Sequence, residues 1–399
     1  MKIFKFLAVA LVAMLGFTAC DKETEHIYDD HSKDLVGTWT CLTADYAEVL
    51  IINADGSAVS YGVEDGEYWE NVRGTVTVKE NNITMIFEDD DNFTGHFDII
   101  PGMAFSLFED SGERYIYQYC AKDLSDEIVG MWVSTDNSPV EEHNMFIQTF
   151  YDNGKSTYTG FGEMDGEIVV EKESNYKVIG DVSFQEINGK YIAWKLSYSH
   201  NGTSLGDIMT NTNGDYTSTS TWLRIKQSLD LPGNKYDYIK TFVSNVKGED
   251  KDIPFLNTSF NFAKMDGSII DKFLKSILFT VEFPEANKIK YSYLLEGKNI
   301  VIDAPIEVDG NKMTIKMSAN NPAYQDVDMY AFQDQDNTQM HWYMPTTSFE
   351  KFFANTSVHV MLGNGQLKEN DTEEIAGVYK TIADAVESIN LSLVMTKAK

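Results

Sequence analysis

The side chains best suited to catalysis or metal binding are few or dispersed in this chain. Its seven histidines are scattered, and none has the paired spacing of a zinc-binding helix. Three cysteines are too few for a four-thiolate zinc site, and neither a Gly-rich phosphate loop nor a nucleophile elbow is present. The sequence therefore predicts a protein that is not an enzyme, with no catalytic residues, no metal and no cofactor.

Clustered carboxylates are the strongest metal-site candidates, because calcium prefers several oxygen ligands. Two segments, 88–92 and 334–337, carry such clusters. Both lack the central glycine and the terminal glutamate of the twelve-residue calcium loop. In a chain with 62 acidic and 32 basic residues, a solvated turn is the simpler interpretation of either cluster.

One loop combines aromatic and acidic side chains. Tyr61, Tyr68 and Trp69 flank an acidic turn at 64–67. Aromatic faces stack on sugar rings, and carboxylates accept hydrogen bonds from sugar hydroxyls. These three residues are therefore the candidate ligand-binding residues, facing a glycan or similar ligand. The alternative is that the same aromatic rings only cover the end of a barrel.

The balance of charge excludes one class of partner. The formal net charge is -30, and nucleic acid is bound through lysine and arginine contacts to phosphates, so we expect no nucleic-acid partner. Hydrophobic residues make up 43% and aromatic residues 13% of the 399 residues, enough to bury a core. The length corresponds to about two to four domains.

The first twenty residues predict export. Lys2 and Lys5 form a cationic start, and about ten apolar residues follow at 6–15, as in a secretory signal peptide. This run is shorter than the about 20 residues of a membrane-spanning helix. Segment 15–20, Leu-Gly-Phe-Thr-Ala-Cys, resembles the lipobox of bacterial lipoproteins, with Phe17 where leucine is commonest. The resemblance implies cleavage before Cys20 and lipidation of Cys20; a plain signal peptide with an incidental cysteine is the alternative.

The acidic residues after Cys20 indicate a destination. Segment 21–25 is similar to the acidic export tag of Bacteroidetes surface lipoproteins, although it also fits a solvated linker. Cleavage removes Lys2 and Lys5, leaving 30 basic and 62 acidic residues and a net charge of -32. Anionic lipid repels such a body, so the acyl chains on Cys20 would hold it on the membrane. We therefore expect a lipid-anchored outer-membrane protein exposed at the cell surface.

Internal similarity divides the rest of the chain into three units. Leu35–Trp39 matches Ile128–Trp132 at an offset of 93, and 62–67 matches 162–167 at an offset of 100. Segment 161–168 shares five of eight residues with 262–269, which include a repeated Met-Asp-Gly interpreted as turn punctuation. The predicted organisation is a signal peptide at 1–19, a lipidated cysteine and acidic tether at 20–34, unit 1 at 35–124, unit 2 at 125–228 and unit 3 at 229–399.

Short runs with a period of two, separated by turn residues, predict strands throughout the three units. Strands at about ten-residue spacing indicate antiparallel barrels or sandwiches. Unit 3 adds apolar stripes of helical spacing at 269–278, 349–353 and 375–389. The predicted fold class is mainly β, with tandem antiparallel units, the last being α+β, and a helix before the final strand would cap one end of a barrel.

The Gly-x-Trp pattern at the start of units 1 and 2 narrows this fold. Gly37 with Trp39, and Gly130 with Trp132, resemble the first strand of lipocalin-like domains, including lipocalin-like or calycin-like surface lipoproteins of Bacteroidetes. The resemblance implies β-barrels whose floor is plugged by the tryptophan. It also implies a basic residue of the last strand over this ring: Arg224 over Trp132 in unit 2, but only Lys122 in unit 1. Core tryptophans of unrelated sandwiches are the alternative.

Two cysteines remain after Cys20. Cys41 lies on the predicted first strand of unit 1 and Cys120 at the end of its last strand, and such strands are neighbours in a closed barrel. A disulfide is therefore a candidate in an exported protein, and two buried free thiols are the equal alternative.

Two functions remain open. The first is non-catalytic capture of a small apolar molecule, peptide or glycan at the barrel mouths or between units. The second is a structural or interaction lipoprotein, whose barrels are filled and whose outer surfaces bind a protein partner. The barrel interior distinguishes them, because a barrel packed with Phe, Tyr and Met leaves no room for a ligand.

Overall fold

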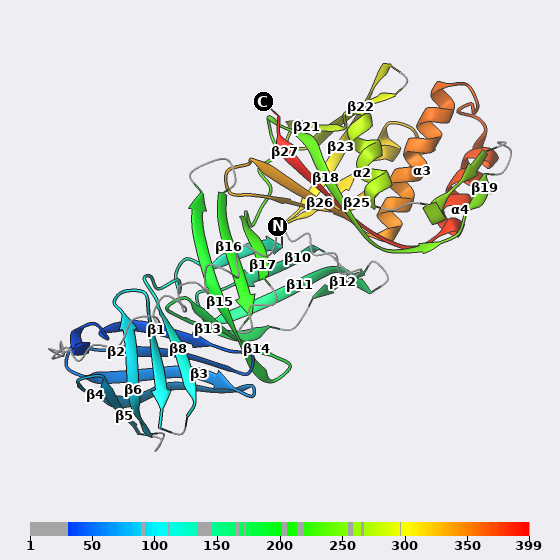
Figure 1. Cartoon of the computed structure of the whole chain (residues 1–399). Coiled ribbons are helices and arrows are strands. Elements are labelled where there is room, and N and C mark those ends of the chain that lie inside the picture. Colours follow the sequence, from blue (N-terminus) through cyan, green and yellow to red (C-terminus); the bar gives the residue numbers. More distant parts are fainter. Residues whose placement is uncertain are drawn as a thin grey trace.

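The computed structural model describes residues 31–398, except 89–91, 111, 135–144, 165–166, 171–172, 202–205, 214–218, 254–257, 265–266 and 296. Figure 1 shows three β units in a row, in the order of the sequence, from blue through green to red. The predicted signal peptide, Cys20 and most of the tether lie outside the described residues, as does the middle of the first calcium candidate, 89–91.

Unit 1 is a closed eight-stranded antiparallel barrel, called barrel 1, with sequential strand order. Its strands alternate inward and outward side chains, as the period of two predicts. They are β1 (Gly37–Leu42), β2 (Tyr46–Ile52), β3 (Ser57–Glu64), β4 (Glu67–Lys79), β5 (Asn82–Phe87), β6 (Asn92–Ile100), β7 (Ala104–Glu109) and β8 (Arg114–Tyr119).

Unit 2 is a nine-stranded antiparallel sheet in the order β10-β9-β17-β16-β15-β14-β13-β11-β12. An additional pairing of β10 with β11 connects its two ends, so that β12 is a branch on β11. The strands are β9 (Gly130–Ser134), β10 (Met145–Phe150), β11 (Lys155–Met164), β12 (Glu167–Val170), β13 (Ser174–Ile179), β14 (Val182–Ile187), β15 (Lys190–Asn201), β16 (Gly206–Asn213) and β17 (Thr219–Ile225).

Unit 3 contains a second closed eight-stranded barrel, called barrel 3, and its helices. The barrel strands are β18 (Asn234–Gly248), β21 (Thr280–Glu285), β22 (Lys288–Leu295), β23 (Lys298–Asp309), β24 (Lys312–Ile315), β25 (Val327–Gln333), β26 (Gln339–Met344) and β27 (Val386–Lys397). Beside them lie the hairpin of β19 (Lys251–Ile253) and β20 (Thr258–Phe260), and the helices α2 (Gly267–Ser276), α3 (Thr346–Gly363) and α4 (Thr372–Ala385). Three short 3₁₀ turns complete the described elements: η1 (His31–Lys33), η2 (Phe262–Lys264) and η3 (Met317–Ala319).

The predicted fold class is confirmed: the chain is mainly β, with two closed antiparallel eight-stranded barrels and a C-terminal helical part. Two helix boundaries differ from prediction. The stripe predicted at 349–353 belongs to the longer α3, and the stripe predicted to reach 389 ends at Ala385, where β27 begins. The apolar residues after Ala385 are buried on both faces of a strand, so their helical spacing was coincidental.

One sequence repeat does not repeat in structure. The first copy, at 62–67, lies in the β3–β4 hairpin, and the described residues of the second, at 162–164 and 167, lie at the end of β11 and the start of β12. The described residues of the third copy, at 262–264 and 267–269, form η2 and the first residues of α2. The described residues of the third copy therefore do not mark an equivalent strand pair. The Asp residues of both Met-Asp-Gly segments lie outside the described residues, so the interpretation of Met-Asp-Gly as turn punctuation stays a prediction.

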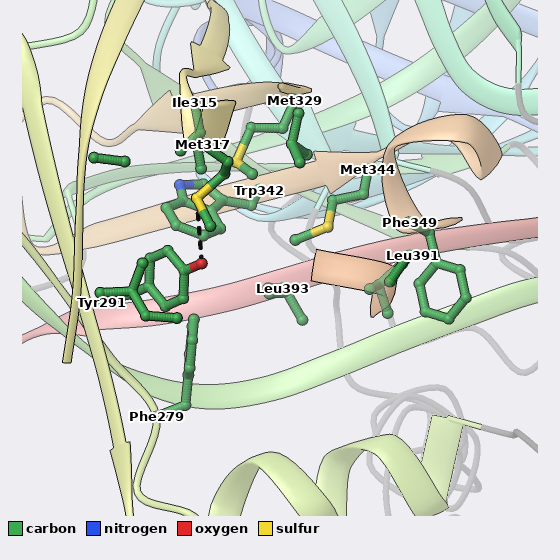
Figure 2. Close-up of a cluster of buried hydrophobic side chains, with 14 of the residues drawn as sticks. Phe279, Tyr291, Ile315, Met317, Met329, Trp342, Met344, Phe349, Leu391 and Leu393 are labelled. Carbon is green, nitrogen blue, oxygen red and sulfur yellow. Dashed lines mark hydrogen bonds between the residues drawn. The ribbon is translucent and has the colours of Figure 1, made fainter. Parts of the chain in front are cut away.

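Packed side chains fill the centres of both closed barrels. Barrel 1 holds a cluster that includes Trp39, Phe97 and Phe105. Barrel 3 holds a larger cluster rich in methionine, shown in Figure 2, where the Tyr291 hydroxyl donates to Met317 Sδ at 3.5 Å. The side chains of both clusters are fully or almost fully buried, so neither barrel encloses a solvent-filled lumen.

The two barrels close by seams of different length. In barrel 1, β1 pairs with β8 through Trp39–Tyr119 and Thr40–Gln118, and the N–H of Cys120 donates to the carbonyl of Thr38 at 2.8 Å. In barrel 3, β18 pairs with β27 through ten residue pairs, from Tyr236 to Gly248 on β18. Closure of barrel 1 therefore depends more on its packed interior than on its seam.

Unit 2 is joined to both barrels. Outward residues of β2, including Val49, pack against Phe184 of β14 in one apolar cluster. On the other side, the backbone N–H of Lys226 donates to the carbonyl of Gln333 at 2.8 Å, beside an apolar cluster that includes Phe332. Among the described residues, no helix has both the length and the apolar character needed to cross a bilayer.

Candidate functional site

The Gly-x-Trp starts of units 1 and 2 have matching geometry. In each unit the indole Nε1 donates to the carbonyl four residues earlier, Trp39 to Leu35 and Trp132 to Ile128, both at 2.7 Å. Both tryptophans are fully buried. The glycine two residues before each tryptophan has a positive φ, 149° in unit 1 and 136° in unit 2, which other residues rarely adopt.

Arg224 lies over Trp132, as the resemblance implies, with its guanidinium 4.5 Å from the ring centroid. The same guanidinium donates to the carbonyl of Val129 at 2.9 Å and to the carbonyl of Glu127. It therefore ties the last strand of unit 2 to the segment that enters the first strand. We call the Arg224 guanidinium, the Trp132 ring and the carbonyls of Glu127 and Val129 the Arg224 clasp.

Unit 1 uses an aromatic ring in the same place. Tyr119 is in register with Trp39, just as Arg224 is in register with Trp132, and its ring packs edge-on at 5.2 Å. The alternative cation, Lys122, instead lies 5.5 Å from the ring of Tyr198 in unit 2. The resemblance to lipocalin-like domains implies a basic residue at this place, so it did not point to Tyr119.

The candidate disulfide between Cys41 and Cys120 is not formed, and both are free, buried thiols. Cys41 points into barrel 1, whereas the Cys120 thiol donates to the carbonyl of Lys122 at 3.1 Å and contacts the backbone near Gly180 of unit 2. The two side chains thus lie on opposite faces of neighbouring strands. Burial raises the pKa of the Cys41 thiol to about 12 and that of Cys120 to about 11.

The three candidate ligand-binding aromatics do not converge. Tyr61 and Tyr68 point outward from barrel 1 into its junction with unit 2. There Tyr68 stacks on Tyr191 with ring centroids 4.7 Å apart, and Lys177 lies 5.4 Å from the ring of Tyr61. Two of the three predicted residues therefore build the contact between units.

Trp69 takes part in a buried polar network that the sequence did not predict. Its indole N–H donates to Ser60 Oγ at 3.0 Å, and Ser60 donates to Glu48 Oε1 at 2.7 Å. Glu48 Oε2 accepts from the hydroxyl of Tyr46 at 2.7 Å and from the hydroxyl of Tyr117. We call these five residues the Glu48 cluster.

The Glu48 cluster holds a buried carboxylate among neutral donors. Glu48 lies at an inward position of β2, between the outward Ala47 and Val49, so its carboxyl group faces the barrel interior. Burial and then the Glu48 charge raise the pKa of Tyr46 and Tyr117 well above the ordinary value, so both phenols remain protonated donors. The β2 pattern contained the signal: an acid at an otherwise apolar inward position.

A groove of about 660 Å³ opens beside this cluster, between barrel 1 and unit 2. We call it the junction groove. Tyr46 belongs to both features, since its hydroxyl bonds Glu48 and its residue lines the groove. The remaining lining comes from two loops of barrel 1 and one hairpin of unit 2: Thr43, Ala44, Asp45, Ala47, Val63, Asp65, Gly66, Ile187, Asn188, Lys190, Tyr191, Ile192, Ala193 and Trp194.

Backbone contacts fix the walls of the junction groove. The N–H of Tyr191 donates to the carbonyl of Gly66 at 3.0 Å, which joins the hairpin of unit 2 to the β3–β4 turn. The N–H of Asp65 donates to the carbonyl of Asp45 at 3.2 Å, which joins the two loops of barrel 1. The groove is therefore a product of the junction, and neither unit would form it alone.

The second acidic segment, 334–337, is a structural turn. Asp334 accepts hydrogen bonds from the backbone N–H groups of Thr338 and Gln339, at 2.6 and 3.1 Å. Asn337 donates to Asp230, in the segment that leads into β18 of the same unit, at 2.8 Å. Among the described residues, no three His, Cys, Asp or Glu side chains are grouped to hold a metal ion.

Comparison with known proteins gives weak likenesses. No family model and no curated protein matches the chain. Transferrin binding protein B of Haemophilus parasuis Hp5, as a double mutant, is 11% identical over 89% of this chain and 66% of its own, with a TM-score of 0.23. The serogroup B Neisseria meningitidis protein of that name is 9% identical over the same shares, with a TM-score of 0.21. The DNA polymerase III β subunit of Thermotoga maritima is 10% identical over 72% of this chain and 94% of its own, with a TM-score of 0.13. The chain thus spans about two thirds of the two transferrin binding proteins, and no conclusion about function follows from these scores.

Proposed function

We propose that this protein is an exported, lipid-anchored binding protein whose non-catalytic ligand site is the junction groove. The observation that carries the proposal is the groove of about 660 Å³ beside barrels whose centres are packed. An apolar small molecule would need an enclosed cavity, whereas an open groove with polar and aromatic walls suits a peptide or a glycan.

The lipid anchor is the part of the proposal that rests on sequence. The lipobox-like segment ends at Cys20, and the acidic residues 21–25 follow it. We expect cells fed radiolabelled palmitate to label the wild-type protein and not a Cys20→Ser variant. External protease should remove the labelled protein from intact cells; an unlabelled wild type, or one protected from protease, would contradict this part.

The groove is tested by filling it. Ala44 is exposed in the groove wall, and Ala286 is exposed in the β21–β22 turn of barrel 3. We expect the wild-type protein to bind defined members of a glycan or peptide array, Ala44→Trp to lose this binding, and Ala286→Trp to retain it. Equal binding by both variants would place the ligand elsewhere.

The filled barrels also favour a second candidate function, an interaction protein that binds its partner through outer surfaces. Ile269 and Phe273 of α2 and the following Leu278 are about half exposed or more on barrel 3, as such a surface requires. Array binding that survives Ala44→Trp but is lost in an Ile269→Asp and Phe273→Asp double variant would favour this function.

A further inference from the structure

We propose that the junction groove binds a basic peptide segment, held by the carboxylates of Asp45 and Asp65 and by the aromatic ring of Tyr191. The inference rests on the proposed function, and it names the chemistry of the ligand. Four features of the groove carry it: unpaired carboxylates, an aromatic face, a preorganised wall and the charge of the whole chain.

The two groove carboxylates differ from others at the same junction. Glu70 pairs with Lys177 at 2.6 Å and Asp181 pairs with Lys195 at 2.7 Å, so these acids are already neutralised. Asp45 and Asp65 are exposed, and neither forms an ion pair with any part of the chain that the structure describes. A lysine or arginine of a ligand would supply the missing partners.

Aromatic residues lie next to these acids. Tyr191 lines the groove and belongs to the apolar cluster between barrel 1 and unit 2, whereas the rings of Tyr46 and Trp194 pack against the interior clusters of barrel 1 and unit 2. An aromatic face attracts a cation placed over it. The two carboxylates and the Tyr191 ring together form a site for an ammonium or guanidinium group, because the carboxylates supply the opposite charge and the ring contacts the partly desolvated cation. A sugar would use the ring and would gain less from the carboxylates.

The wall that presents these groups is ordered before a ligand arrives. The hydroxyl of Tyr46 is held by Glu48 at 2.7 Å, and the ring of Tyr191 is held by stacking on Tyr68. The hydrogen bond from Asp65 to Asp45 keeps the two acidic loops together. Preorganisation lowers the ordering cost of binding, so a short segment suffices as a ligand.

The charge of the chain acts in the same direction. A formal net charge of -30 attracts a basic segment from a distance and repels an acidic one. Lys190 is the one basic residue among those lining the groove, and its stem packs on Gly66. Its ammonium opposes a cationic ligand, which gives a substitution that should strengthen binding.

The test uses the full chain in a non-ionic detergent and a fluorescent hexalysine peptide, with a glycine-serine hexapeptide as the uncharged probe. We expect hexalysine to bind with an affinity that falls as salt rises, and the uncharged probe not to bind. Asp45→Asn with Asp65→Asn should weaken hexalysine binding about tenfold, and Lys190→Glu should strengthen it by about threefold, as expected for exposed charge pairs.

A control variant that loses the same two negative charges outside the groove distinguishes binding in the groove from general attraction to an acidic protein. Asp98 on β6 and Asp309 on β23 are exposed outside the groove, and their double Asn variant should change binding by less than about twofold. Equal weakening by the two double variants would overturn the inference. Array ligands that are glycans, lost in Ala44→Trp but insensitive to salt and to the groove Asn pair, would also overturn it while leaving the proposed function standing.

Discussion

Replacing Tyr117 with phenylalanine measures what the Glu48 cluster contributes to barrel 1. The Tyr117 hydroxyl donates to Glu48 inside the barrel, and the side chain is almost fully buried. A hydrogen bond to a charged group is worth about 1.5–3 kcal/mol. Since Glu48 keeps Tyr46 and Ser60 as donors, we expect Tyr117→Phe to lower the free energy of opening of barrel 1 by about this amount.

Tyr115 offers a matched control on the same strand. Its hydroxyl donates to the carboxylate of Glu113 at 2.6 Å, in an exposed position where such a bond is worth less than about 1 kcal/mol. Hydrogen exchange of peptides from β2 and β8, followed by mass spectrometry, reports the opening of barrel 1 separately from the other units. Equal protection in Tyr117→Phe and Tyr115→Phe would refute the idea that the buried carboxylate stabilises the barrel.

The same residue predicts a pH dependence. Burial raises the pKa of Tyr117 well above its ordinary value of 10.0. Above pH 10 the unfolded chain loses the phenol proton while the folded chain keeps it, so the folded state binds more protons and stability falls as pH rises. This one residue contributes a slope of about 1.4 kcal/mol per pH unit. The slope is absent in Tyr117→Phe, so the difference in stability between wild type and variant should narrow above pH 10; a constant difference would contradict it.

Three further predictions concern the unit starts and the thiols. Arg224→Met should remove the contact with Trp132 and two hydrogen bonds to carbonyls. Hydrogen exchange should then show that the free energy of opening of β9 and β17 is lower by about 2–4 kcal/mol. Unchanged protection would show that the Arg224 clasp is not stabilising. Gly37→Ala places a Cβ at a φ of 149° and 2.8 Å from an aromatic ring, so urea denaturation should show a loss of about 1–3 kcal/mol, and a neutral result would contradict the strain. Native Cys41 and Cys120 should resist a thiol reagent at pH 8, because their pKa values are raised to about 12 and about 11, and both should react after denaturation. Recovery of only unreactive, linked cysteines after denaturation would show a disulfide instead.

Local patterns in the sequence predicted the features that depend on near neighbours. The period of two gave the strand-rich units, because inward and outward side chains alternate along each strand. The Gly-x-Trp starts predicted two equivalent buried tryptophans, and the contact of Arg224 with Trp132 is present. These features depend only on the first strand of a unit and its neighbour, and the internal similarity of units 1 and 2 indicates where those strands lie.

The junction depends on distant residues, and the sequence did not predict it. Tyr68 faces Tyr191, more than one hundred positions later, so the candidate loop becomes part of an interface. Glu48 stands at an otherwise apolar inward position of β2, but its partners Ser60 and Tyr117 lie on other strands, which a local pattern does not reveal.

The short seam of barrel 1 has a mechanical consequence. The chain enters the barrel at Gly37 and leaves after Tyr119, and β1 and β8 pair near that same end, through Trp39–Tyr119 and Thr40–Gln118. A pull between the N-terminal segment and unit 2 therefore peels the seam, breaking its hydrogen bonds one after another. The seam of barrel 3 is longer, because β18 and β27 pair through ten residue pairs. A molecule tethered by its N-terminal end would yield to force first in barrel 1, which would then lengthen the tether while the units beyond it stay folded.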